Sequence, residues 1–333
     1  MPLFQIQPGV NPLPKDINLA GKNVIVTGAN AGIGYESARQ LLALNAEVVI
    51  LGVRNIDKGE EAKKSLLQDE TIRGGGRSAS SVKVMKLDLA EYVSVVDFVS
   101  RVRAEVEELH VLILNAAIGN VDLQCASSGH ELLLQVNFLS SALLLLQLLP
   151  LLEESAKKSG APSRINWVGS RAMVISSLRW HPIKGNTISH FDDPKNFYSF
   201  QRYGDTKAMA FMFLRELATR IEPSRVILNT VCPGLVHSRI AEVLPFYYRY
   251  VMRLFKSFTA RPTEEGARIV VFMVAVAGAE SHGKFYVNQA EEKTPAFMDT
   301  ADGLEMQRLV WKDSLSELSQ QATLPFEVSE DQQ

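Results

Sequence analysis

The sequence is short of cysteine, of net charge and of a basic leader segment, and each shortage narrows what the protein can be. Only Cys125 and Cys232 occur among 333 residues, far apart and without metal-ligand spacing, so we expect reduced packing residues, no disulfide and no metal site. The net charge of −2 gives no reason to expect nucleic acid as a partner. Residues 1–15 lack a basic stretch followed by an apolar one, so we expect no secretory signal and an intracellular, by default cytoplasmic, protein.

Long apolar segments are also scarce, and the two that exist have competing interpretations. Residues 132–152 are about as long as a membrane span, but Gln135 and Asn137 lie among them, so a buried helix is favoured and no transmembrane segment is expected. Residues 244–258 mix aromatic with basic side chains. This stretch is interpreted first as a wall over an apolar substrate pocket, and contact with a membrane surface is the open alternative.

A glycine loop near the start of the chain predicts a nucleotide site. The apolar segment 24–27 leads into Gly28, Gly32 and Gly34, and a helical pattern follows. These glycines allow a tight turn, close approach of the backbone to a phosphate and close packing of helix on strand. The free N–H groups at the start of the helix favour an anion. Because the loop lies between a strand and a helix, dinucleotide binding is favoured over a plain turn.

Short apolar runs alternate with helical patterns along most of the chain. Predicted strands cover residues 23–27, 47–52, 82–87, 111–115, 164–169, 225–231 and 284–287, and predicted helices lie around 33–45, 57–70, 91–107, 128–153, 201–221 and 263–277. Such alternation is typical of a parallel sheet covered on both faces. We predict one α/β domain over 21–318, a Rossmann-type doubly wound parallel sheet of about seven strands with helices on both faces. An N-terminal extension (1–20) precedes it and a polar tail (319–333) follows.

Four polar residues suggest catalysis at the carboxyl ends of the strands. Tyr203 and Lys207 lie on one face of a predicted helix, where the ammonium group favours the phenolate and lets the tyrosine exchange a proton nearer neutral pH. Ser170 ends a predicted strand, and ligands bind at such ends in open α/β sheets. Asn137 lies in the apolar helix, either as a satisfied core asparagine or as the anchor of a water beside the lysine.

Together these motifs resemble the short-chain dehydrogenase/reductase family, from the first strand to Ser238. The resemblance assigns catalysis to Asn137, Ser170, Tyr203 and Lys207, and cofactor binding to Thr27, Gly28, Asn30, Gly32, Ile33, Gly34, Asp88, Leu89, Asn115, Tyr203, Lys207, Pro233, Gly234, Val236 and Ser238. Two positions depart from the family pattern. Ala117 replaces a glycine after Asn115, which bears on packing against the first strand, and Ser238 replaces a threonine.

The spacing between motifs points to a branch of the family and to a substrate class. Ser170 and Tyr203 are 33 residues apart, more than in compact members, and the inserted segment resembles the retinol-dehydrogenase-like branch. The sequence is also similar to fungal reductases, including those of secondary metabolism. Insertions at 171–202 and 237–262 are expected to shape the substrate pocket, and their apolar content favours a bulky, largely apolar ketone or aldehyde.

The second predicted strand favours NADP(H) over NAD(H). An NAD-preferring site usually has an acidic residue near the end of this strand, but Val53 lies there and Arg54 follows. A guanidinium group can bind the 2′-phosphate of NADP(H) through charge-assisted hydrogen bonds.

The resemblance implies reduction of a carbonyl by hydride transfer. Tyr203 would protonate the oxygen, Ser170 would hold it, Lys207 would lower the pKa of the tyrosine and bind the ribose, and Asn137 would hold a water. Two alternatives stay open: a non-catalytic NADP-binding sensor or scaffold, and a non-redox step such as dehydration, isomerisation or cyclisation. A homodimer or homotetramer is common in the family, and a monomer is the alternative.

Overall fold

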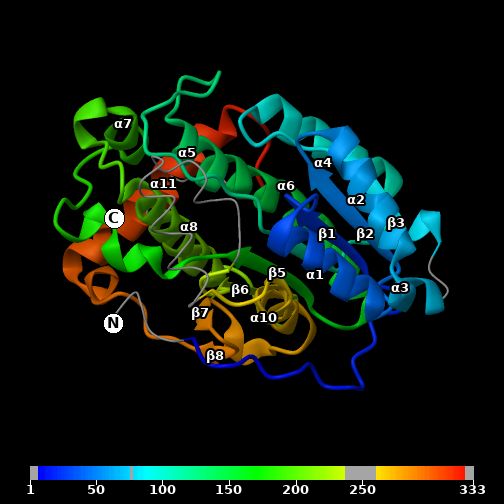
Figure 1. Ribbon diagram of the computed structural model, residues 1–333. Coiled ribbons are helices and arrows are strands. Elements are labelled where there is room, and N and C mark those ends of the chain that lie inside the picture. Colours follow the sequence, from blue (N-terminus) through cyan, green and yellow to red (C-terminus); the bar gives the residue numbers. More distant parts are fainter. Residues whose placement is uncertain (1–6, 76–77, 237–259, 327–333) are drawn as a thin grey trace.

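The computed structural model describes residues 7–75, 78–236 and 260–326, which form a twisted sheet with helices on both faces (Figure 1). The strands are β1 (Asn23–Thr27), β2 (Val48–Val53), β3 (Val82–Lys86), β4 (Val111–Leu114), β5 (Ser163–Val168), β6 (Val226–Cys232), β7 (Lys284–Val287) and β8 (Ala290–Glu291). Their order is β3-β2-β1-β4-β5-β6-β7-β8, and β1 to β7 pair in parallel. The predicted doubly wound parallel sheet is therefore confirmed.

The sheet differs from the prediction at one edge. The seven predicted strands lie within one residue of their expected bounds, because each is a short apolar run that both layers of helices bury. An eighth strand, β8, pairs antiparallel with β7 through Tyr286 opposite Glu291 and Val287 opposite Ala290. It has two residues, too few to produce an alternating pattern that sequence could reveal.

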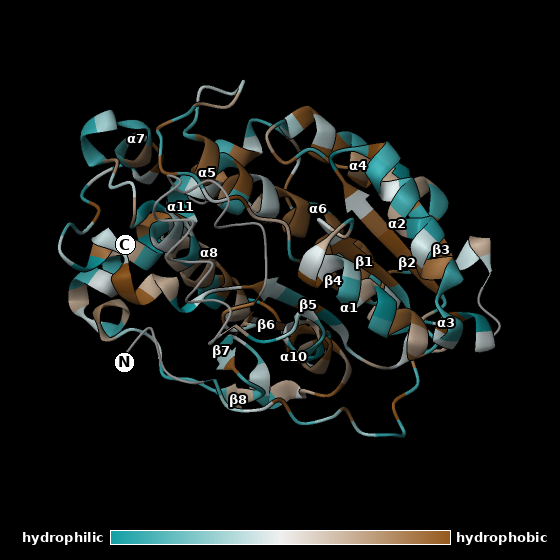
Figure 2. Ribbon diagram, in the orientation of Figure 1, coloured by the Kyte–Doolittle hydropathy of each residue, from teal (hydrophilic) through white to brown (hydrophobic). Residues whose placement is uncertain are grey.

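Helices cover both faces of the sheet. They are α1 (Gly32–Ala43), α2 (Ile56–Gln68), α3 (Glu70–Gly74), α4 (Tyr92–Glu105), α5 (Leu132–Leu134), α6 (Ser140–Ser159), α7 (Thr187–Asp192), α8 (Arg202–Ala218), α10 (Thr263–Ala275) and α11 (Ala301–Ser319). Buried residues of α1, α2 and α10 share one core cluster, and those of α4, α6, α8 and α11 share the other. Figure 2 shows the apolar strands and α6 inside, with the polar surface of α2 outside.

The apolar segment that resembled a membrane span is a core helix. α5, a π-helical turn (Gln135–Leu139) and α6 form one continuous run, Leu132–Ser159, which is long and apolar enough to cross a membrane. Nearly all of its most apolar part is buried in the domain, against α4, α8 and the sheet. The predicted buried helix is confirmed, although it begins and ends later than expected.

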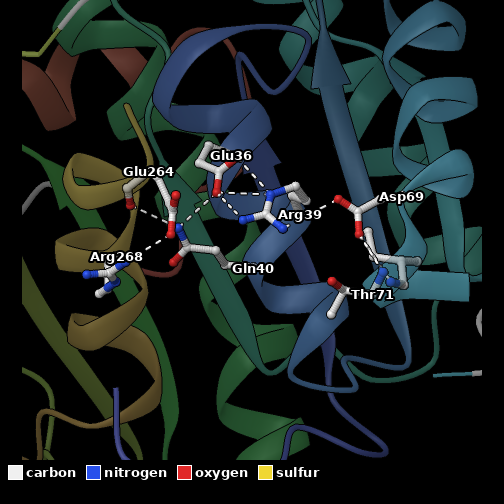
Figure 3. A network of polar contacts seen from close by, with 8 residues as sticks. Glu36, Arg39, Gln40, Asp69, Thr71, Glu264 and Arg268 are labelled. Carbon is white, nitrogen blue, oxygen red and sulfur yellow. Dashed lines mark hydrogen bonds and ion pairs between the residues drawn. The ribbon is translucent and has the colours of Figure 1, made fainter. Parts of the chain in front are cut away.

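A polar network holds α1, the helix of the glycine loop, to its neighbours (Figure 3). Arg39 pairs with Glu36 at 2.7 Å and with Asp69 at 3.5 Å, and Asp69 also caps α3. Gln40 Nε2 donates to the carbonyl oxygen of Glu264 at 2.9 Å, which joins α1 to the first turn of α10. The second half of α1 is therefore fixed from both sides.

Both ends of the described chain pack onto the domain. Residues 7–13 pass beside β8 and α10 in Figure 1, and Gln289 exchanges two hydrogen bonds with the backbone of Asn11. At the other end, Ala322, Leu324 and Phe326 pack against the core, and the Phe326 ring lies 5.8 Å from that of Trp311. Residues 320–326 thus lie against the domain, although sequence predicted a polar tail from 319, because α11 brings an apolar strip to this point.

Candidate active site

The glycine loop forms a close-packed cradle with the ends of β1 and β4. Thr27 Oγ1 accepts hydrogen bonds from the backbone N–H groups of Asn115 and Ala116, each at 2.9 Å. Asn115 Nδ2 donates to the Thr27 carbonyl oxygen at 2.8 Å. A Cβ at Gly34 would lie 2.6 Å from both Asn115 Nδ2 and the Gly28 carbonyl oxygen, so only glycine fits. The predicted residues Thr27, Gly28, Gly34 and Asn115 are therefore brought together, and the alanine after Ala116 does not prevent this packing.

The start of α1 can bind an anion. Gly28 and Gly32 have φ values of +67° and +58°, and the space beside Gly32 is open. Ala31 precedes the helix and supplies no side-chain cap, so the first N–H groups of α1 have no side-chain acceptor there. Asn30 and Ile33 are half-buried in the same loop. Backbone N–H groups at a helix N-terminus suit a phosphate.

The other predicted nucleotide residues lie along the same edge of the sheet. Arg54 follows β2 and is exposed, while Asp88 and Leu89 follow β3, the strand that pairs with β2. Asp88 Oδ1 accepts from the N–H of Ala90 at 3.1 Å, and Ser94 Oγ accepts from the N–H of Asp88 at 2.9 Å. These contacts fix the loop after β3. Arg54 is exposed at the end of β2, the strand that pairs with β1 and so precedes the same edge as the glycine loop.

Ser170, Tyr203 and Lys207 meet at the carboxyl end of β5. The Ser170 hydroxyl lies close enough to Tyr203 to act on the pKa of its phenol. Lys207 Nζ donates to the Val168 carbonyl oxygen at 2.7 Å and lies 5.7 Å from the centroid of the Tyr203 ring. Ser170 comes from the end of β5 and the other two from the first turns of α8. The predicted serine, tyrosine and lysine thus form one cluster.

Burial changes the acid–base behaviour of this cluster. The protein interior raises the pKa of Tyr203, and the Ser170 hydroxyl offsets part of that rise. Burial lowers the pKa of Lys207 to about 8. Burial therefore outweighs the opposing effect of Ser170 on the pKa of Tyr203, and the expected effect of Lys207 on this phenol stays a prediction. A neutral phenol is a proton donor, which is the state that reduction requires.

Asn137 is a satisfied core residue that links two parts of the site. Its Oδ1 accepts from the N–H of Ile118 at 2.8 Å, and its Nδ2 donates to the Ile118 carbonyl oxygen at 2.9 Å and to Thr206 Oγ1 at 3.2 Å. It lies in the π-helical turn, a feature often found at functional sites. Through Thr206 it is tied to α8 between Tyr203 and Lys207. Its role in holding a water stays a prediction.

The predicted nicotinamide segment follows β6. Gly234 has a φ of +83°, and Val236 is buried and pairs with Arg261 in a parallel bridge. Pro233 connects Gly234 to the buried Cys232 at the end of β6. Ser238, His237 and residues 244–258 lie outside the described residues.

Three residues that contact the site, Gln7, Arg261 and Asp205, were not predicted from the sequence. Gln7 clamps Leu235, because its Oε1 accepts from the Leu235 N–H and its Nε2 donates to the Leu235 carbonyl oxygen, both at 2.8 Å. Arg261 packs against Gly234 and is 4% exposed. Asp205, fully buried in α8, accepts from the hydroxyls of Ser176 and Ser177 at 2.7 and 2.8 Å. An acidic residue inside the Tyr203–Lys207 interval was the signal that could have identified Asp205.

A cavity opens beside the loop that follows Ser170. It has a volume of about 370 Å³ and lies between the 3₁₀ turns after Ser170 and the segment after β8. Its lining is mostly apolar, with Met173, Val174, Phe285 and Phe297 among its residues and Arg171 at one side. The front of the predicted insertion 171–202 therefore does line a cavity, together with part of residues 289–309.

Known proteins are similar to this chain in sequence and in fold. A family model described as short chain dehydrogenase matches residues 22–175. The short chain dehydrogenase macD of Penicillium terrestre is 44% identical over 97% of this chain and 98% of its own length. The short-chain dehydrogenase/reductase tropG of Talaromyces stipitatus is 43% identical over the same shares. Among solved structures, an L-sorbose reductase of Gluconobacter frateurii complexed with NADPH and L-sorbose has a TM-score of 0.61, with 20% identity over 82% of this chain and 96% of that one.

Proposed function

The chain belongs to the short-chain dehydrogenase/reductase family and is an oxidoreductase, and we propose that it reduces a carbonyl group on a bulky, largely apolar small molecule with NADPH. The convergence of Ser170, Tyr203 and Lys207 on one site carries this proposal. It places a hydroxyl donor and a protonated phenol side by side at the carboxyl end of β5, where a carbonyl oxygen can accept from both.

The cradle of β1, α1 and β4 fits a dinucleotide. Gly34 and Gly28 allow close backbone approach, and the uncapped start of α1 offers N–H groups to a diphosphate. Thr27 and Asn115 hold this cradle through their mutual hydrogen bonds. When bound, the nicotinamide supplies the hydride that reduces the carbonyl carbon.

Ser170, Tyr203 and Lys207 act on the carbonyl oxygen of the substrate and on the proton that it receives. Ser170 donates a hydrogen bond to the carbonyl oxygen and orients it. Tyr203 donates its phenolic proton to that oxygen as negative charge develops, and its raised pKa keeps it protonated at neutral pH until then. Lys207, protonated below its pKa of about 8, stabilises the phenolate that remains. Asp205 holds the loop after Ser170 against α8, so the hydroxyl groups of Ser170 and Tyr203 keep their relative positions.

Arg54 supports NADPH over NADH. It is exposed immediately after β2, where it can bind a 2′-phosphate, and no acidic side chain stands at the end of that strand. Titration of the protein with NADPH and NADH tests this choice. We expect Arg54→Ala to reduce the preference for NADPH by about tenfold or more, the effect of a charge-assisted hydrogen bond of roughly 1.5–3 kcal/mol. Arg73→Ala, which removes an exposed arginine from α3, is the control; an unchanged NADPH/NADH ratio in Arg54→Ala contradicts the assignment.

Turnover of NADPH with a panel of aryl and alkyl ketones tests the reaction itself. We expect one NADPH consumed for each alcohol formed, and a large loss of turnover in Ser170→Ala. Product without NADPH consumption would favour a dehydration, isomerisation or cyclisation. Tight NADPH binding without turnover of any carbonyl would favour a sensor or scaffold.

The relatives and the cavity also bear on the biological setting of the protein. The relatives macD and tropG are fungal proteins, which supports, without identifying a pathway, a role in fungal secondary metabolism. An intracellular, cytoplasmic location and a homodimer or homotetramer remain proposals from sequence and family resemblance. The apolar cavity of about 370 Å³ supports a bulky, apolar substrate.

A further inference from the structure

Arg171 and Arg261 both lie near the Cys232 thiol, where β5 and β6 end. Arg171 directly follows Ser170, and its backbone N–H donates to Cys232 Sγ at 3.4 Å. Arg261 lies against Gly234, since a Cβ at this glycine would be 3.1 Å from Arg261 Nε. Burial raises the pKa of the Cys232 thiol, and the charges of both arginines offset part of the rise. Arg171 therefore lies next to Ser170, and Arg261 lies against Gly234 at the end of β6.

Each of these arginines has buried donor nitrogens without an acceptor. Arg171 uses Nη2 in an ion pair with Glu292 at 3.1 Å, and Arg261 uses Nη2 in a hydrogen bond to the Pro8 carbonyl oxygen at 3.3 Å. Arg171 Nε and both Nε and Nη1 of Arg261 are buried and have no hydrogen-bond partner. Arg261 as a whole is only 4% exposed. Buried, charged donors without acceptors lower the stability of a fold, so a ligand that supplies acceptors is expected there.

Another buried arginine shows how the chain satisfies such a group when no ligand is needed. Arg202 also has an unpaired Nε. Its guanidinium carbon lies 4.4 Å from the centroid of the Phe191 ring and 5.1 Å from that of Phe197, and its Nη2 donates to the Asn196 carbonyl oxygen at 2.7 Å. Aromatic faces thus compensate the Arg202 cation. Within the described ranges, neither Arg171 nor Arg261 stacks on a ring in this way.

The cavity beside Arg171 indicates what the rest of the ligand is. Met173, Val174, Phe285 and Phe297 give it an apolar lining, and its volume is about 370 Å³. Around it, Arg171, Arg179 and Lys293 outnumber the one carboxylate, Glu292. A ligand that fits both features has an apolar body and an anionic end.

We propose that Arg171 and Arg261 bind a carboxylate of the substrate, so that the enzyme reduces an apolar keto or aldehyde acid. The proposal rests on the proposed function and specifies its substrate class. A carboxylate has two oxygens that can each accept from a guanidinium donor, and a charge-assisted pair is stronger than a neutral hydrogen bond. Binding the acid group here fixes the substrate at the end next to Ser170 and leaves the apolar body for the cavity.

A matched pair of ketones tests this substrate class. Acetophenone and its para-carboxylate differ only in the anionic group, and NADPH consumption gives kcat/KM for each. We expect the wild type to prefer the carboxylate by at least about tenfold, which corresponds to one good ionic contact. Arg171→Met and Arg261→Met should reduce this ratio about tenfold, and Arg261→Lys should restore part of it. Arg164→Met is the control, because this partly buried arginine lies at the opposite end of β5.

Two further measurements separate the proposal from its competitors. If Arg261→Met raises the Kd of NADPH and leaves the ratio of the two ketones unchanged, the anion is the cofactor diphosphate and the proposal is wrong. If the wild type turns over neither ketone, calorimetric titration of the NADPH-loaded protein with benzoate still tests the anion site. Benzoate binding that Arg171→Met abolishes supports the site even if the proposed reaction fails, and equal binding to both proteins, or none to either, overturns it.

Discussion

The two sides of the sheet's carboxyl edge differ in how their polar groups are satisfied. On the β1–β4 side, Thr27 and Asn115 pair with each other and with the backbone, and the glycines leave no room for side chains. On the β5–β6 side, Arg171 and Arg261 keep buried donors without acceptors. On the first side, the polar side chains of Thr27 and Asn115 are satisfied before any ligand binds, and only backbone N–H groups at the start of α1 are left for a ligand. The second has groups that a ligand must satisfy, as expected where a family shares its cofactor and each member selects its substrate.

The largest expected effect tests whether the β5–β6 side is the chemical centre. Tyr203→Phe removes the proposed proton donor, so kcat should fall by about 10²–10⁴-fold while the Kd of NADPH stays nearly unchanged. Steady-state turnover and a fluorescence titration measure the two quantities. Tyr286→Phe, which removes a hydroxyl from the other core cluster on β7, should retain activity. Substantial turnover in Tyr203→Phe would remove the tyrosine from its role.

The next prediction should disturb only the β1–β4 side. Gly34→Ala places a methyl group 2.6 Å from Asn115 Nδ2 and from the Gly28 carbonyl oxygen, so the cradle must shift. We expect the Kd of NADPH to rise by about tenfold or more, a loss of at least about 1.4 kcal/mol. Gly74→Ala is the control, since nothing lies within 4 Å of a Cβ there. Unchanged NADPH affinity in Gly34→Ala would mean that the cradle does not hold the cofactor.

A smaller effect should come from the contact between the N-terminal segment and the loop after β6. Gln7→Ala removes both hydrogen bonds to Leu235, the residue after the predicted nicotinamide contact Gly234. Each neutral hydrogen bond contributes about 0.5–1.5 kcal/mol, so we expect the KM for NADPH to rise about three- to tenfold. Gln289→Ala removes the matching pair of bonds to Asn11, farther along the same N-terminal segment. Equal effects of both variants would show that Gln7 only anchors the segment.

Sequence predicted the first side better than the second, for a physical reason. A β1–α1 glycine loop is a local structure, so neighbouring residues determine it, and the seven parallel strands follow from their apolar runs. Gln7 and Leu235 are 228 positions apart, and no local pattern pairs an amide with so distant a backbone. The helix α11 was missed although its signal exists: Trp311, Leu315 and Leu318 are buried at i, i+4 and i+7.

The smallest expected effect is a change in the free energy of unfolding alone, and it comes from the contacts of His130. His130 Nδ1 lies 2.8 Å from Asp192 of α7, and Nε2 lies 3.2 Å from Glu317 of α11. The hydrogen bond to Asp192 raises the pKa of His130, against the opposing effect of burial, and Glu317 adds to the rise. Because the folded pKa exceeds the unfolded value, this contribution is complete below about pH 6.5 and is lost as the pH rises through the folded pKa.

Denaturant unfolding of wild type and His130→Gln across this pH range therefore distinguishes the two sides. We expect the variant to lose about 1–2 kcal/mol at pH 6 and much less at pH 9, with unchanged affinity for NADPH. His190→Gln is the contrast, because burial lowers the pKa of His190 and its contribution is lost as the pH falls. A pH-independent loss in His130→Gln would show that His130 acts by packing. A loss of NADPH affinity would show that the β1–β4 side depends on the contacts of His130 with Asp192 and Glu317, and that the two sides are not independent.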